Sequence, residues 1–148
     1  WGGTVNMCGN RGDIESTRRG VGTYGTGGIA GRSVSSDSRV TESFNSGKIS
    51  SNTEATGGVV GYVNASGATV SECYNTGEIT VKGRNGNKNI SESYAGGVIG
   101  TVGAVGVVVE NCYNSATVTG ADISGGVIGY YINESGDNSE DKYMSHNY

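Results

Sequence analysis

The chain repeats itself, and this repetition restricts its fold more than any other feature. One motif, Gly-Gly-apolar-apolar-Gly, occurs at 27–31, 57–61, 96–100 and 125–129. A second, Val-x-x-(Cys/Ser)-aromatic-Asn-x-Gly-x-(Ile/Val), begins at residues 40, 70 and 109, with partial copies beginning at residue 5 and near residue 144. A period of about 29 to 39 residues is typical of solenoids and other repeat architectures. We therefore treat residues 1–148 as a single repeat array, and the incomplete copies lead us to expect that it is a segment of a longer one.

The composition indicates strands. The chain has 28 Gly and no Pro, Leu is absent, and Val, Ile, Thr and Tyr supply much of the rest. Glycine disfavours helices, whereas β-branched and aromatic residues favour strands. A single unit cannot bury its apolar face alone, but stacked units can. The sequence predicts an all-β fold, a parallel β-helix or β-solenoid of four to five coils of roughly 29–39 residues.

Two repeated positions have structural interpretations. An Asn recurs in the second motif and predicts a ladder of hydrogen-bonded amides along the axis. The aromatic position before it predicts a row that packs inside the coil; the alternative is an exposed row on which sugar rings stack. The Asn position holds Asn10, Asn45, Asn75 and Asn114, and the aromatic position holds Phe44, Tyr74, Tyr113 and Tyr148.

Cysteine shares one repeat position with serine. Cys8, Cys73 and Cys112 align with Ser43. We expect small buried thiols here, because in-register stacking makes the side chains parallel and a disulfide between Cys73 and Cys112 awkward. Strict alternation would put Val70 and Cys73 on opposite faces, whereas a bend between them would bring them together. The sequence leaves both arrangements open.

Three features suggest binding. Arg11-Gly12-Asp13 spells the integrin-recognition tripeptide, but it aligns with ordinary turn residues elsewhere in the array. Tyr62 and Tyr130 directly follow a glycine box, and Tyr24, Tyr94 and Tyr131 are further candidates for an exposed aromatic cluster. The segment Asn133–Asp141 gathers four acidic residues, which we interpret as a solvated loop, with calcium binding as the alternative.

Other functional classes find no support in the residues. The net charge is −4 and no basic tract indicates nucleic acid. No apolar run approaches the roughly 20 residues of a membrane span. The single histidine, His146, belongs to no catalytic or metal motif, and the Asp residues occupy unlike repeat positions. We expect a protein that is not an enzyme and that uses no cofactor or metal.

The segment GGVVGYVNASGATVSECYNTGEIT, which begins at Gly57, resembles the GLUG-motif repeat. The resemblance extends from Val5 to Tyr148, and it departs from the pattern at Gly9, at Ala116 and after Val81. It implies a secreted or wall-attached bacterial protein. Such repeats occur in adhesin-like proteins and, outside the catalytic part, in immunoglobulin-A1-cleaving metallopeptidases.

Three functions are compatible with this sequence. The chain is expected to be a structural or adhesive segment of a larger secreted or cell-surface protein. Alternatively, it is a module that binds a host glycan or protein, through a sheet face or through loops such as 85–91, or an auxiliary domain of a surface metallopeptidase. Strand edges at the ends of the array also predict end-to-end self-association.

Overall fold

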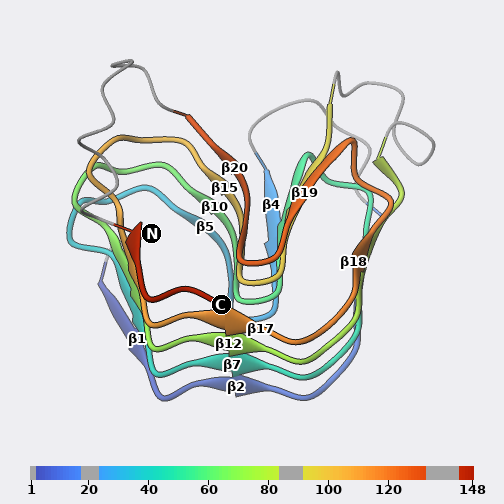
Figure 1. The fold of residues 1–148 in the computed structure, drawn as a ribbon, viewed down its shortest axis with the longest axis horizontal. Coiled ribbons are helices and arrows are strands. Elements are labelled where there is room, and N and C mark those ends of the chain that lie inside the picture. Colours follow the sequence, from blue (N-terminus) through green and yellow to red (C-terminus); the bar gives the residue numbers. More distant parts are fainter. Residues whose placement is uncertain (1–2, 18–23, 84–91, 133–143) are drawn as a thin grey trace.

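The computed structural model describes residues 3–17, 24–83, 92–132 and 144–148, and it confirms the predicted all-β solenoid (Figure 1). Five short strands make one coil, and the coils stack through parallel sheets. Coil 1 contains β1 (Thr4–Asn6), β2 (Gly9–Asn10), β3 (Ile14–Ser16), β4 (Gly25–Gly27) and β5 (Ala30–Ser33). Coil 2 contains β6 (Arg39–Thr41), β7 (Phe44–Asn45), β8 (Ile49–Ser51), β9 (Ala55–Gly57) and β10 (Val60–Val63).

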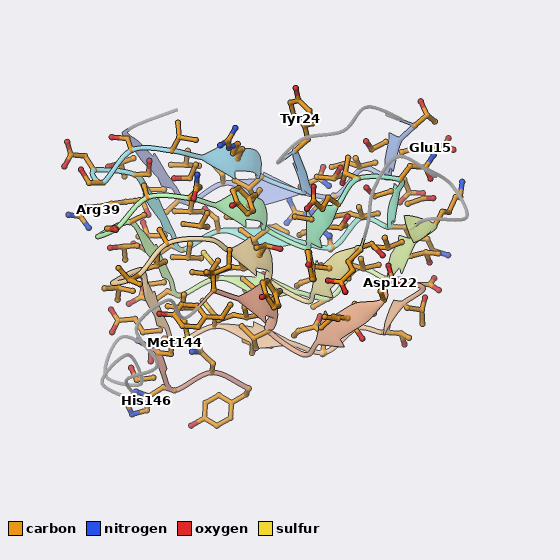
Figure 2. All side chains as sticks on the ribbon, turned by 90° about the horizontal axis from the view of Figure 1, so that it is seen from above. Glu15, Tyr24, Arg39, Asp122, Met144 and His146 are labelled. Carbon is orange, nitrogen blue, oxygen red and sulfur yellow. The ribbon has the colours of Figure 1, made fainter. Side chains whose placement is uncertain are left out.

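The same strand order recurs in the remaining coils. Coil 3 contains β11 (Thr69–Ser71), β12 (Tyr74–Asn75), β13 (Ile79–Val81), β14 (Tyr94–Gly96) and β15 (Ile99–Val102). Coil 4 contains β16 (Val108–Glu110), β17 (Tyr113–Asn114), β18 (Val118–Thr119), β19 (Ile123–Gly125) and β20 (Ile128–Tyr131), and β21 (Met144–Ser145) opens a fifth turn. Figure 2 shows the stack from Glu15 and Tyr24 in coil 1 to Met144 and His146 at the opposite end.

Equivalent repeat positions lie in rows along the axis. The strand order of the first sheet is β1-β6-β11-β16-β21, and its pairs join Val5 to Val40, Val40 to Val70, Val70 to Val109 and Val109 to Met144. The other four sheets each take one strand from every coil, and we name every sheet after its first strand. Insertions in the sequence therefore leave the register of the rows unchanged.

Each coil folds inward, so that the β4 sheet and the β5 sheet pack against each other in the middle of the cross-section (Figure 1). Glycine permits this close approach. A Cβ on Gly61 would lie 2.5 Å from the amide nitrogen of Thr26 and 2.6 Å from the carbonyl carbon of Gly25. Gly100 meets Thr56 in the same way. The last glycine of the Gly-Gly-apolar-apolar-Gly motif is thus the residue that lets the two sheets touch.

The tip of the inward fold rests on the asparagine row. A Cβ on Gly58 would lie 2.5 Å from Cγ of Asn75, and Gly97 stands in the same relation to Asn114. No side chain larger than hydrogen fits at these two positions. The contact between the glycine turn and the asparagine that follows it in the chain explains why the two sequence motifs keep their spacing.

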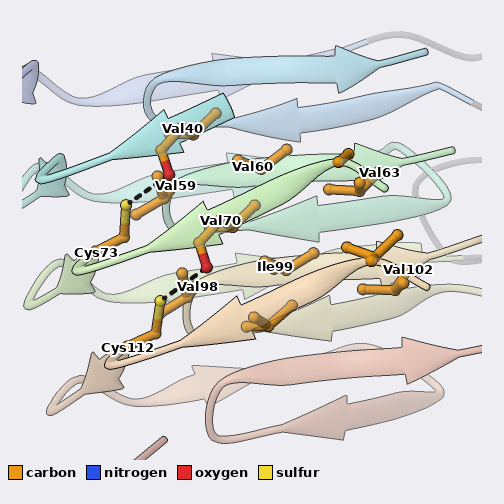
Figure 3. Packing of buried hydrophobic residues seen from close by; sticks show 13 residues of the cluster. Val40, Val59, Val60, Val63, Val70, Cys73, Val98, Ile99, Val102 and Cys112 are labelled. Atoms are coloured by element: carbon orange, nitrogen blue, oxygen red, sulfur yellow. Dashed lines mark hydrogen bonds between the residues drawn. The ribbon is translucent and has the colours of Figure 1, made fainter. Parts of the chain in front are cut away.

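The inward fold divides the interior into two cores. The larger lies between the β1 sheet and the β5 sheet (Figure 3), and its fully buried members include Val40, Val59, Val60, Val63, Val70, Val98, Ile99, Val102 and Val109. The smaller contains Ile49, Ile79, Val81 and Ala95. Val and Ile make up most of both cores, in keeping with their preference for strands.

A backbone bend recurs just before the cysteine position. Met7, Glu42, Glu72, Asn111 and His146 have φ angles between 48° and 53°. This left-handed conformation is costly for residues other than glycine, so its recurrence marks a fixed corner of the coil. The bend reverses the alternation of side chains, and both Val70 and Cys73 are buried. Of the two arrangements that the sequence left open, the bend is correct.

Candidate functional site

The asparagine row forms the predicted ladder. Nδ2 of Asn10 donates to Oδ1 of Asn45 at 2.8 Å, Asn45 donates to Asn75 at 2.7 Å, and Asn75 donates to Asn114 at 2.8 Å. Each Nδ2 also donates to the carbonyl two residues later, as from Asn75 to Gly77 at 2.8 Å. The row connects all four coils and holds the turns beside it, which gives it a structural role.

The aromatic row lies outside both cores, and the prediction that it packs inside the coil is wrong. Phe44 and Tyr74 are half-buried, and Tyr113 is 43% exposed. The bend at Glu72 turns Cys73 inward, so that the next side chain points outward. Ring centroids are 5.1 Å apart in both the Phe44–Tyr74 and the Tyr74–Tyr113 pair, at interplanar angles of 7° and 4°. The rings cover each other's faces and present their edges to solvent.

Tyr148 takes the fifth place in this row. Its amide donates to the carbonyl of Cys112 at 2.9 Å, as the amide of Tyr113 donates to Cys73 at 3.1 Å. Its side chain is 80% exposed. A sugar platform needs an open ring face, and the stacked rings inside the row do not offer one.

The two inner cysteines are buried free thiols, as expected. Cys73 and Cys112 are both fully buried, whereas the same expectation is wrong for Cys8, which is exposed in the first coil. The thiol of Cys73 donates to the carbonyls of Ser71 at 3.1 Å and Val40 at 3.5 Å (Figure 3). Ser43 makes the equivalent bond to Thr41 at 2.7 Å. The adjacent Cys112 thiol and burial both raise the pKa of Cys73, so its reactive thiolate form is disfavoured.

The tripeptide Arg11-Gly12-Asp13 is exposed in the turn between β2 and β3, as its register suggested. Its two charged side chains contact the next coil. The guanidinium carbon of Arg11 lies 4.8 Å from the ring centroid of Phe44, and Oδ1 of Asp13 accepts a hydrogen bond of 2.9 Å from the amide of Lys48. Both side chains therefore help to hold coil 1 on coil 2.

A groove lies where the β4 and β5 sheets diverge at the outer end of the inward fold. It has a volume of about 150 Å³. It brings together four of the five tyrosines that the sequence analysis gave as candidates for an exposed cluster. The fifth, Tyr131, packs against the larger core. The lining residues are Tyr24, Glu54, Ala55, Tyr62, Tyr94, Thr101, Tyr130 and Ile132.

The tyrosines differ in how they line the groove. Tyr62 is only 8% exposed, and its hydroxyl end packs over Gly103. Tyr94 and Tyr130 stack with centroids 4.5 Å apart at 20°. The hydroxyl of Tyr94 donates to Oε2 of Glu92 at 2.7 Å; burial and this carboxylate both raise the pKa of Tyr94. The raised pKa keeps the Tyr94 phenol neutral, and the tyrosine rings form an aromatic wall of the groove.

Two polar side chains of the groove, those of Thr101 and Glu54, were not predicted from the sequence as candidate site residues. The hydroxyl of Thr101, a residue 97% buried, has no hydrogen-bond partner within the described part of the chain. Partial burial raises the pKa of Glu54, whose carboxylate meets no cation or hydrogen-bond donor among the described residues. Glu54 was missed because its row does not repeat one residue type: Ser93 and Asp122 occupy it in the later coils.

Two segments that were predicted as candidate binding loops lie outside the described residues. They are the acidic stretch Asn133–Asp141 and the loop 85–91. Among the residues that are described, no three His, Cys, Asp or Glu side chains gather as a metal ion would need. No helix in the described ranges is long and apolar enough to cross a membrane.

No protein-family model, curated protein or solved structure matches this chain. The resemblance to the GLUG-motif repeat therefore stays a prediction, and the case for function rests on the geometry given above.

Proposed function

We propose that this chain is a non-catalytic structural segment, a rigid spacer within a larger secreted or cell-surface bacterial protein. The observation that carries the proposal is the unbroken asparagine ladder, which links equivalent residues of all four coils. Repeat arrays of this kind gain stability from neighbour contacts, and their length grows with the number of coils. The GLUG-like motifs support the assignment to a bacterial surface or secreted protein.

Deletion of one coil tests the spacer proposal. Removing residues 70–108 joins Thr69 to Val109, which occupies the same repeat position as Val70. We expect the shortened chain to fold and to bring two terminal fluorophores closer by roughly the 4.8 Å strand spacing. A shortened chain that does not fold, or an unchanged fluorophore distance, would contradict the proposal.

The cellular location needs its own test. Antibodies raised against the isolated chain should label intact cells of the encoding bacterium, or detect the protein in the culture medium. Labelling only after the cells are broken open would refute an extracellular role.

Self-association follows from the same architecture. Among the described residues, strands β18, β19 and β20 each pair on one side only, whereas the outer edge of β17 is hydrogen-bonded to Tyr148. We propose that a second copy stacks on these edges, because coil 1 offers the same rows in the same register. Sedimentation should show oligomers that grow with concentration, and a strictly monomeric chain would exclude this partner.

A further inference from the structure

The groove contains a charge that no described residue balances. The Glu54 carboxylate is partly withdrawn from water, and no cation of the described residues lies within ion-pair distance of it. Burying a carboxylate without a partner costs free energy. A cationic ligand would recover this cost, whereas a neutral one would not.

The walls around this carboxylate are aromatic. Tyr24, Tyr62, Tyr94 and Tyr130 come from four successive coils and face the same small volume. Tyrosine rings attract organic cations through their negative faces, and the attraction strengthens where water is excluded. Tyr62 already attracts one cation, because the guanidinium carbon of Arg32 lies 5.6 Å from its ring centroid.

The hydroxyl of Thr101 adds a directional contact. Its Oγ is buried in the groove wall and has no partner among the described residues, so it is available to accept a hydrogen bond. An N–H or O–H donor on the ligand would satisfy it. Unsatisfied buried hydroxyls are uncommon in folded proteins, and a functional role or a bound water or ion is among the recognised explanations.

We propose that the groove binds a small organic ammonium group, with the cation among the tyrosine rings beside Glu54 and a donor of the ligand directed at Thr101. The volume of about 150 Å³ suits one head group and not a chain of sugars.

Titration with choline, n-butylammonium and 3,3-dimethylbutan-1-ol tests the proposal. The last compound has the shape of choline without its charge. We expect both cations to bind in the millimolar range, as a few cation–π contacts and one ion pair allow, and the neutral alcohol to bind at least tenfold more weakly. Nuclear magnetic resonance of the tyrosine ring protons gives the dissociation constants on the intact chain.

Variants separate the charge from the shape. Glu54→Gln should weaken both cations at least tenfold and leave the alcohol unaffected, because only the charge changes. Glu72→Gln, an exposed position at the bend between β11 and β12, is the matched control and should bind as the unaltered chain does. Thr101→Val should weaken choline binding without lowering the urea midpoint of unfolding. If the hydroxyl had only a structural role, its loss would lower the midpoint and leave choline binding unchanged.

Three outcomes would overturn the proposal. They are equal binding of choline and 3,3-dimethylbutan-1-ol, no binding of either cation at tens of millimolar, and undiminished binding by a folded Glu54→Gln chain. Binding of methyl glycosides in place of the cations would assign the groove to carbohydrate. Each outcome is independent of the spacer proposal, which the coil deletion tests separately.

Discussion

Replacing Asn75 by alanine tests how much the asparagine ladder stabilises the solenoid. The side chain makes four hydrogen bonds. It donates to the carbonyl of Gly77 and to Oδ1 of Asn114, both at 2.8 Å, and Oδ1 accepts from Asn45 at 2.7 Å and from the Gly77 amide at 3.2 Å. Asn75 is fully buried, so water cannot reach its partners to replace these bonds in the folded chain.

The expected cost follows from these contacts. At about 1 kcal/mol net for each hydrogen bond, Asn75→Ala should lower the free energy of unfolding by about 4 kcal/mol. With a urea dependence of about 2 kcal/mol per molar, the unfolding midpoint should fall by about 2 M. Far-ultraviolet circular dichroism during urea titration measures this shift.

Asn10 provides the matched control. It occupies the same repeat position in coil 1, where one side of the row has no neighbouring Asn among the described residues and the side chain is only half-buried. Water can replace its bonds, and we expect Asn10→Ala to cost about 1 kcal/mol. The double variant of Asn45 and Asn75 should show a coupling of about 1 kcal/mol, because the two side chains share one bond. If Asn75→Ala costs no more than Asn10→Ala, the ladder is not what stabilises the array.

Three further predictions follow from other contacts. Gly97→Ala should destabilise the folded chain by at least about 3 kcal/mol, because the new Cβ would meet the Gly126 carbonyl and the Asn114 side chain. Gly126→Ala, whose Cβ has nothing within 4 Å, should be nearly neutral. Equal urea midpoints of the two variants would refute the argument from close packing. A thiol reagent should label Cys8 in the native chain and reach Cys73 only in urea, and rapid native labelling of both would show that the larger core opens readily. Burial raises the pKa of Glu54 above 4.5, so the contribution of Glu54 to stability falls as the pH rises through the interval just above 4.5. At neutral pH, Glu54→Gln should therefore have a higher urea midpoint than the unaltered chain, and this difference should disappear near about pH 4. A difference that does not change with pH would exclude burial of the Glu54 carboxylate as its cause.

The sequence predicted the fold because stacking turns a repeat along the chain into a row in space. Once Val40, Val70 and Val109 are aligned, the partners of every other repeated residue follow without any knowledge of the coil's shape. The asparagine ladder was predictable for the same reason. Its geometry depends only on register and on the strand spacing.

The path of the chain within one coil was not predictable in the same way. A left-handed bend at Glu72 has no consistent local signal, since the same corner is formed by Met7, Glu42, Asn111 and His146 in the other coils. Without that bend, the alternation of side chains along a strand places the aromatic row on the wrong side of the sheet, inside the coil. Its exposure therefore emerged only from the structure.

The groove was half predictable. Its tyrosines attracted notice because they follow or precede the glycine boxes, but Glu54 and Thr101 stand at positions where the residue type changes from coil to coil. They meet only because the inward fold brings the β4 and β5 sheets together. A contact between non-repeated residues on two different sheets is outside what periodicity can reveal.

The inward fold also determines where this architecture accepts new sequence. The links inside it are residues 28–29, 58–59, 97–98 and 126–127, and they have one length in all four coils. The corner between the third and fourth strands instead takes 17–24, 52–54, 82–93 or 120–122. A peptide epitope inserted within the longest of these links, 82–93, should therefore be tolerated, whereas the short link of coil 2 contains the buried residues Asn52 and Thr53. Protein engineers could use the long links as mounting points, because the rows on either side of them keep their strand spacing.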